Sequence, residues 1–192
     1  MQTNTPSSGE LVLIRHAPAA VPGRLYGCTD VAARIDPAAI SALKARLGDV
    51  AQVISSPAQR CRQTAEALFG TSLEDARLWE QDFGAHDGLP FEALPDLGIL
   101  SAAALARHAA PGGESFADLC TRTAPALAQH GAQANWGGPV ALVVHAGVIR
   151  SALALVIGSV PGALAFEVAP LSLTRLRCGA DGPVSVIEVN RQ

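Results

Sequence analysis

The sequence predicts an α/β fold, a three-layer α/β/α sandwich with helices on both faces of a mostly parallel, mixed sheet. Two short apolar runs, at 11–14 and 140–144, indicate strands buried on both faces, as in parallel sheets. Segments with the apolar spacing of helices alternate with the predicted strands. The chain has 192 residues without an internal repeat or linker. This predicts one domain over 10–192, preceded by a disordered or frayed polar tail at 1–9.

Caps and prolines predict where the first helices lie. Asp36-Pro37 is an N-cap followed by a proline at the first helical position, and the helix that it begins ends at Gly48. Ser56-Pro57 repeats this pattern for a second helix that ends at Gly70. The segment 50–54 between the two helices is predicted to be a short strand.

The second half of the chain continues the alternation. The segment 78–84 is predicted to be a brief strand that runs into a loop, and 96–110 to contain a short helical piece. Ser115, with Asp118 three residues later, resembles a capping box for a helix over 116–130. The remaining predicted elements are a helix from just after His145 to Ile157 and two strands, 171–177 and 184–189, that form a hairpin and make the sheet mixed.

The composition argues against several classes of function. The formal net charge is −3, so nucleic acid is not an expected partner. The four cysteines lack the spacing of metal ligands, so a zinc site is not expected and the thiols are expected to be reduced. No cofactor is expected. The segment 1–9 lacks the pattern of a signal peptide, and the longest apolar stretch, 151–160, is too short to span a bilayer. We expect a cytoplasmic monomer or homodimer that binds a small molecule and no membrane.

Charged and polar residues follow three of the predicted strands. Arg15 and His16 come directly after the first strand, the segment 55–60 follows another, and His145 follows a third. Because the carboxyl ends of parallel strands meet at one edge of a sheet, we expect these residues to lie together. Helix starts at Ser56 and just after His145 add unpaired N–H groups. Arg15 and Arg60 can each donate two hydrogen bonds to phosphate oxygens. The sequence therefore predicts a phosphate pocket in a mildly acidic protein.

Four motifs in order resemble those of the histidine phosphatase superfamily, which has the phosphoglycerate mutase-like fold. They are Arg15-His16-Ala17 for Arg-His-Gly, residues 56–64 for Ser-x-x-x-Arg-Ala-x-x-Thr, Glu80 to Gly84 with Gly88 for Glu-x-x-x-Gly, and His145-Ala146-Gly147 for His-x-Gly. Each motif is weak alone, but the ordered set spans most of the chain. Ala17 departs from the usual glycine, which leaves the backbone less freedom there.

The resemblance implies a role for each matched residue. His16 would attack phosphorus and carry a transient phosphohistidine, and Arg15, Arg60 and His145 would hold the phosphoryl group. Glu80 would protonate the leaving oxygen and then deprotonate water, although Asp82 two residues on is an alternative acid. A neutral imidazole is a competent nucleophile near neutral pH. Arginines can supply the positive charge that phosphoryl transfer needs, so no metal is implied.

A second, weaker resemblance concerns the substrate. Residues 25–30 resemble the Tyr-Gly-x-x-Asp stretch of the α-ribazole phosphatase branch, which acts in cobalamin biosynthesis, and residues 145–150 also look like that branch. Arg24, Tyr26 and Ala146 are candidate substrate contacts, with an exposed arginine and a packing tyrosine as the alternatives. Glu114 resembles a residue of a family loop near the site and is a candidate acid or substrate contact.

These observations predict a metal-independent phosphomonoesterase that acts on a small phosphorylated metabolite, with α-ribazole 5′-phosphate as the candidate substrate. Two alternatives stay open. One is a phosphotransferase of the phosphoglycerate mutase type. The other is a non-catalytic member of the fold that binds phosphorylated ligands, against which stands the presence of all five candidate catalytic residues.

Overall fold

The fold is built on a six-stranded sheet with the order β3-β2-β4-β1-β5-β6. The structure is a computed structural model that describes residues 9–192. The strands are β1 (Gly9–Arg15), β2 (Gln52–Ser55), β3 (Leu73–Glu74), β4 (Val140–Val144), β5 (Leu173–Gly179) and β6 (Gly182–Arg191). The tail expected at 1–9 lies almost wholly outside the described residues, while Gly9 itself belongs to β1.

The sheet is mixed, as the sequence predicts. β1 pairs in parallel with β4, β4 with β2, and β2 with β3. β5 runs antiparallel to β1 and is joined to β6 as an antiparallel hairpin. The register pairs Arg15 with Val144 and Ser55 with Val143. The carboxyl ends of β1, β2 and β4 therefore lie at one edge of the sheet, and the residues that follow them lie close together.

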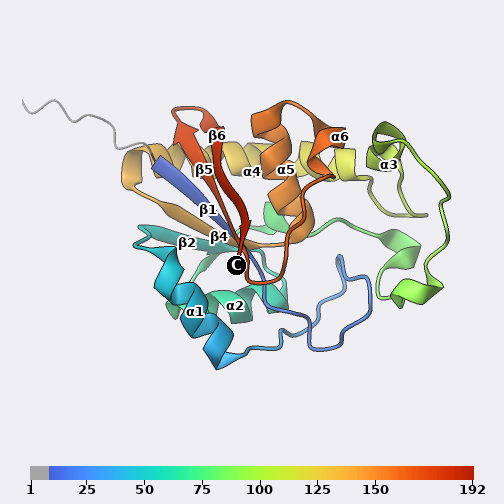
Figure 1. Cartoon of the computed structure of the whole chain (residues 1–192), viewed down its shortest axis with the longest axis horizontal. Helices are drawn as coiled ribbons and strands as arrows, with labels where there is room; N and C mark the ends of the chain where they lie inside the picture. Colours follow the sequence, from blue (N-terminus) through green and yellow to red (C-terminus); the bar gives the residue numbers. More distant parts are fainter. Residues whose placement is uncertain (1–8) are drawn as a thin grey trace, which may run out of the picture.

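Helices cover both faces of the sheet (Figure 1). α1 (Pro37–Leu47) and α2 (Gln59–Phe69) cover one face, where they pack on Val12 and Ile14 of β1. α4 (Phe116–Gly137) and α5 (Ala146–Ile157) cover the other face, where they pack on Leu11 and Leu13. This alternation along β1 produces the predicted three layers. Two short helices, α3 (Ala102–Arg107) and α6 (Val160–Ala163), lie beside α4 and α5.

Most predicted helices are confirmed, with one informative error at α2. Asp36 caps α1 through its side chain, and Ser115 and Asp118 form the predicted capping box at α4. The second helix begins at Gln59 with Ala58 as its N-cap, and not at Ser56. The Ser56 hydroxyl accepts the N–H of Ala58, the residue before the helix, at 3.4 Å and lies 2.8 Å from Nε2 of His145. Among residues 9–192, no helix combines the length and the apolar character needed to cross a bilayer.

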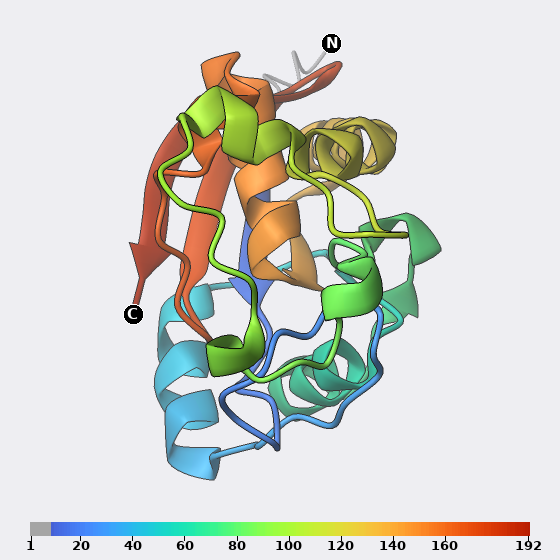
Figure 2. The same cartoon turned by 90° about the vertical axis from the view of Figure 1, so that its right-hand side faces the viewer.

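The segment 78–84 is not the strand that the sequence predicts. A 3₁₀ turn, η1 (Ala76–Leu78), is capped by the side chain of Asp75, and the chain then continues without regular structure. Two further 3₁₀ turns follow, η2 (Gly84–His86) and η3 (Phe91–Ala93). β3 forms one edge of the sheet. The sequence does not reveal this strand, because it has only two residues and both are exposed, so it has no buried apolar pattern. Figure 2 shows the loops 17–36 and 79–101 on the side of the molecule that faces the viewer.

Candidate active site

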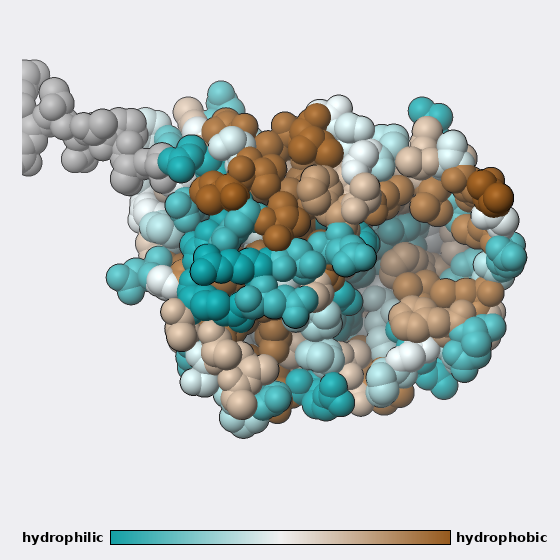
Figure 3. All heavy atoms as spheres, viewed as in Figure 1, coloured by the Kyte–Doolittle hydropathy of each residue, from teal (hydrophilic) through white to brown (hydrophobic). Residues whose placement is uncertain are grey.

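A pocket of about 390 Å³ opens where β1 ends. Arg15, His16, Arg60 and Glu80 line it, although these residues come from three distant parts of the chain. The loops around the pocket contribute mostly apolar side chains. The space-filling view shows the molecule hollowed between the sheet and the loops that lie to its right, with hydrophobic residues on the rim (Figure 3). Arg15, His16 and Arg60 meet here because they follow the carboxyl ends of neighbouring parallel strands. The loop at 79–82 adds Glu80.

His16 is buried, with 7% of its surface exposed, and its ring is fixed by the backbone. The backbone N–H of His16 donates to the carbonyl of Val144 at 2.9 Å. Nδ1 lies 2.7 Å from the carbonyl of Ala17. Because a carbonyl only accepts, Nδ1 carries the proton in this contact, which leaves the lone pair on Nε2. Burial, followed by the charge of Arg60, lowers the pKa of His16 to about 3, so the imidazole is neutral near pH 7.

The two predicted arginines are anchored and still have free donors. Nη1 of Arg15 donates to the carbonyl of Val168, and the guanidinium of Arg60 donates to the carbonyls of Thr29 and Gly27. The Nε of each arginine is buried and has no hydrogen-bond partner within 9–192. A buried donor without a partner costs about 1–3 kcal/mol. A bound oxyanion in the pocket would supply the missing acceptors, so this pair favours an anion ligand.

His145 lies behind His16 and off the wall of the pocket. It is fully buried at the N-cap position of α5, and the centres of the two rings are 5.2 Å apart. Nε2 is 2.8 Å from the Ser56 hydroxyl, and the Cys61 sulfur is 3.5 Å from the same nitrogen. Burial, followed by the charge of Arg60, lowers the pKa of His145 well below its ordinary value. The predicted histidine pair is therefore neutral, and one member stands in direct contact with the pocket.

Glu80 lies across the pocket in the irregular segment after η1. Its carboxylate accepts hydrogen bonds from the N–H groups of Gln81 at 3.0 Å and Gly147 at 3.2 Å. Burial raises the pKa of this carboxyl above the ordinary glutamate value, against the smaller opposing effect of these hydrogen bonds. A Cβ on Gly147 would lie 2.2 Å from Oε1 of Glu80. The glycine of the fourth motif therefore makes room for the carboxylate of the third.

The remaining predicted residues take different positions. Arg24, Tyr26 and Ala146 line the pocket, and Arg24 is tied to the carbonyl of Gly88 at 2.8 Å. Asp82 does not line the pocket, and its carboxylate accepts from the N–H of Gly84. Glu114 does not line the pocket either, and its carboxylate forms an ion pair with Arg122.

Arg150 is a pocket residue that the sequence prediction missed. Its Nε donates to the carbonyl of Phe166 at 2.9 Å, and its charge contributes to lowering the pKa of Arg15. The available signal was its position one helical turn after Ala146. The pocket lining also includes large apolar side chains, together called the outer wall below, which are Val21, Leu25, Phe83, Phe91, Phe116, Leu164 and Val168.

One group of side chains has the spacing of a metal site. Cys28, Asp82 and Asp87 have ligand atoms within 4.8 Å of one another. The two carboxylate oxygens of Asp87 already accept the N–H groups of Gly27 and Thr29. These three residues lie outside the pocket lining, in which the arginines are Arg15, Arg24, Arg60 and Arg150.

The fold and the pocket together define an α/β protein in which two arginines with buried Nε groups and a buried, neutral histidine line one pocket. The chain belongs to the histidine phosphatase superfamily, branch 1, whose family model matches residues 11–190. It is a phosphatase of this superfamily. A comparison with curated protein sequences gives no match.

Solved structures share the fold over nearly the whole chain. A mycobacterial glucosyl-3-phosphoglycerate phosphatase has 24% identity and a TM-score of 0.84, with 96% of this chain and 99% of that chain covered. Its complex with VO3 has 26% identity and the same TM-score, with 96% and 100% covered. A protein of Thermus thermophilus has 28% identity and a TM-score of 0.71, with 95% and 99% covered. These likenesses support the predicted fold; they leave the α-ribazole branch as a prediction.

Proposed function

We propose that the protein hydrolyses phosphate monoesters through a phosphohistidine at His16, without a metal ion. Nε2 of His16 attacks phosphorus and the P–O bond to the leaving group breaks. The leaving oxygen takes the proton of Glu80 as it departs. Water then gives a proton to Glu80 and attacks the phosphohistidine, which releases inorganic phosphate and restores the neutral imidazole and the protonated acid.

The single observation that carries this proposal is the surroundings of His16. Its Nδ1 proton is held by a carbonyl, so the nucleophilic lone pair is on Nε2, in a ring with a pKa of about 3. Two buried arginines with unpartnered Nε donors line the same pocket. Such fixed donors stabilise the charge on a transferring phosphoryl group without reorganisation during the reaction. His145, buried against His16, is proposed to hold a phosphoryl oxygen once the substrate is bound.

Glu80 is the better candidate for the acid than Asp82. Glu80 lines the pocket, and burial raises its pKa, which favours the protonated form needed in the first step. Asp82 lies off the pocket and is engaged by the N–H of Gly84. We therefore assign both proton transfers to Glu80.

For the substrate, we propose a phosphate ester with an aromatic or apolar body, and specifically α-ribazole 5′-phosphate. The outer wall carries seven large apolar side chains, three of them phenylalanines, and such walls bind ring systems. A second candidate is glucosyl-3-phosphoglycerate, the substrate in the name of the mycobacterial neighbour. Arg24 and Arg150, which line the same pocket, favour it, since their guanidinium groups could bind a carboxylate.

The test is phosphate release from an aryl phosphate by the purified protein in the presence of EDTA. We expect turnover with wild type and a loss of at least about 1000-fold in His16→Ala, because the covalent route is removed. Turnover that needs a divalent metal, or that survives in His16→Ala, would refute the proposal.

Release of phosphate from 3-phosphoglycerate without formation of 2-phosphoglycerate separates a hydrolase from a mutase. Comparison of kcat/KM for α-ribazole 5′-phosphate and glucosyl-3-phosphoglycerate decides between the two substrates.

A further inference from the structure

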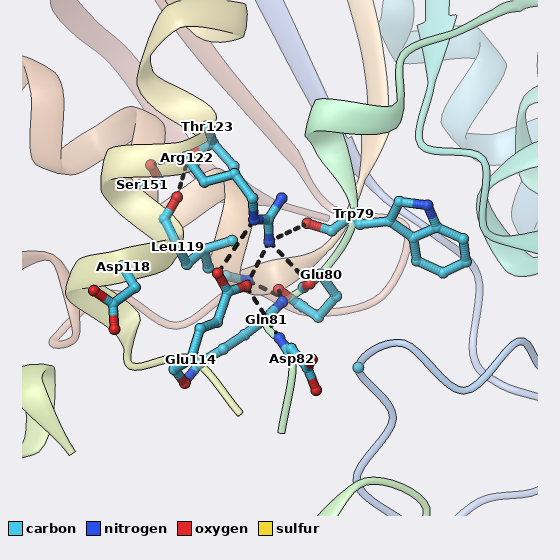
Figure 4. Close-up of polar contacts among 12 residues, drawn as sticks. Trp79, Glu80, Gln81, Asp82, Glu114, Asp118, Leu119, Arg122, Thr123 and Ser151 are labelled. Atoms are coloured by element: carbon cyan, nitrogen blue, oxygen red, sulfur yellow. Dashed lines mark hydrogen bonds and ion pairs between the residues drawn. The ribbon is translucent and has the colours of Figure 1, made fainter. Parts of the chain in front are cut away.

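We propose that Arg122 and Glu114 are positioning residues for the acid of the reaction. They form a partly buried ion pair, called the clamp below, that holds the backbone on both sides of Glu80 (Figure 4). This inference rests on the proposed role of Glu80 as proton donor. It adds two residues that touch neither the pocket nor the reacting atoms and that act through Glu80 alone.

Arg122 binds the carbonyl groups of the segment that leads to Glu80. Its guanidinium donates to Arg77 at 2.9 Å, to Trp79 at 3.2 Å and to Glu80 itself at 3.1 Å. The same group donates to both carboxylate oxygens of Glu114. The guanidinium of arginine has five N–H donors in a rigid fork, so one side chain can bind several carbonyls and a carboxylate at once. The side chain of Arg122 thus fixes the chain directly before and at the acid.

Glu114 holds the segment that follows the acid. Its carboxylate accepts the N–H of Asp82 at 3.1 Å, its own N–H donates to the carbonyl of Asp82 at 2.8 Å, and its carbonyl accepts from the side-chain amide of Gln81 at 2.9 Å. The two backbones approach so closely that a Cβ on Gly113 would lie 2.5 Å from the carbonyl oxygen of Asp82. The clamp therefore restrains the chain on both sides of Glu80.

The backbone around Glu80 depends on these contacts, because the hydrogen bonds that the backbone of 79–82 makes to other segments go to Arg122 and Glu114. The segment between η1 and η2 has no helix or strand hydrogen bonds. The carboxylate itself is held by two backbone N–H groups, one of which belongs to the adjacent residue Gln81 and moves with it. A misplacement of about 1 Å in a catalytic group can cost on the order of 100-fold in rate.

The clamp is built on a rigid support. Glu114 precedes the capping box of α4, and Arg122 lies two turns into that helix. The next residue, Thr123, shares a hydrogen bond of 2.6 Å with Ser151 of α5. Helix α5 also carries Gly147, whose N–H binds the Glu80 carboxylate. The two helices thus hold the acid from both sides, one through its backbone and the other through its side chain.

The chemical signature of such a role is a dependence on the leaving group. A poor leaving group needs a well-placed proton donor, whereas 4-nitrophenolate leaves without one. We expect Arg122→Met to lower kcat/KM for phenyl phosphate about 10- to 100-fold, and for 4-nitrophenyl phosphate less than about 3-fold. kcat/KM is the right quantity because it reports the steps up to departure of the leaving group. Glu114→Gln, which keeps the shape of the side chain, should show the same pattern more weakly.

The matched control is Arg175→Met. Arg175 also binds two carbonyls, of Arg46 and Leu47, and two carboxylates, of Glu10 and Glu188, but it lies away from the pocket. It should lose comparable stability and show no leaving-group dependence. Equal losses on both substrates in Arg122→Met and Glu114→Gln, when urea unfolding shows both variants folded, would overturn the proposal.

A double-mutant cycle with Glu80→Gln tests whether the clamp acts through the acid. In the Glu80→Gln background, Arg122→Met should change kcat/KM for phenyl phosphate by less than about 2-fold, because the group being positioned is gone. Additive losses would refute the clamp while leaving the proposed function intact. If Arg122→Met fails to fold, the same cycle is run with Glu114→Gln. Retained activity in His16→Ala would instead show that the proposed function has failed.

Discussion

His16 and His145 are held neutral by the same burial that builds the pocket. Both rings are at least nine-tenths buried, and both pKa values lie below the ordinary histidine value of 6.5. In the unfolded chain these histidines take up a proton as the pH falls below about 6.5, whereas in the folded chain His16 resists protonation until about pH 3. The unfolded state therefore binds more protons in this interval.

This difference predicts that the free energy of unfolding falls as the pH is lowered. His16 contributes a loss of up to about 2 kcal/mol between pH 6.5 and 5, His145 acts in the same direction, and stability is retained above pH 6.5. Urea unfolding at pH 7, 6 and 5 measures the effect. His16→Gln removes one titrating group and should show a shallower dependence. An equal slope in wild type and His16→Gln would contradict the burial argument.

Glu80 should govern the alkaline side of the reaction. Its pKa is raised by burial, and the first step needs the protonated form, so kcat/KM should fall as the pH rises through this raised pKa. Glu80→Gln should lower kcat/KM for phenyl phosphate by about 100- to 10,000-fold and remove this limb of the profile. Ionisation of the substrate affects both proteins alike. A profile unchanged in shape in Glu80→Gln would assign the limb, and the acid, to another group.

At the scale of elements, the amino end of α5 sets the position of the acid through Gly147. The added methyl group of Gly147→Ala would meet the Glu80 carboxylate. We expect this variant to fold and to lose at least about 10-fold in kcat/KM for phenyl phosphate. Gly137→Ala is the matched control, because a Cβ there meets nothing within 4 Å. Full activity in Gly147→Ala would show that contact with α5 is not needed to place Glu80.

The elements that the sequence predicts correctly are those with a local pattern, either a continuous apolar run or a helix cap. Val12 and Ile14 pack on one face of the sheet and Leu11 and Leu13 on the other, which is what a continuous apolar run requires. Caps at Asp36 and Ser115 also have a local signature. The sequence predicts Ser56 as a cap, but the Ala58 N–H that its hydroxyl accepts at 3.4 Å precedes the helix, and the shorter contact is to His145, 89 residues away in the sequence. No local pattern reports a partner at that distance.

At the scale of the whole molecule, the strand order explains why the candidate site was partly predictable. β4 lies between β1 and β2, so the residues after these strands, around 15–16, 56–60 and 145, must come together. The position of Glu80 could be predicted only by resemblance, since its segment is irregular and its support comes from α4 and α5. The apolar outer wall could not be predicted, because it is assembled from loops whose paths have no periodic signal.

Trapping of the phosphoenzyme shows whether the phosphoryl group passes through His16. The protein is mixed with an excess of 4-nitrophenyl phosphate, quenched in alkaline denaturant during turnover, digested, and analysed by mass spectrometry. We expect a phosphoryl group on the peptide that contains His16, stable in alkali and lost in acid, and absent in His16→Ala. A phosphoryl group on a different residue, or turnover in wild type with no phosphorylated peptide, would contradict this expectation.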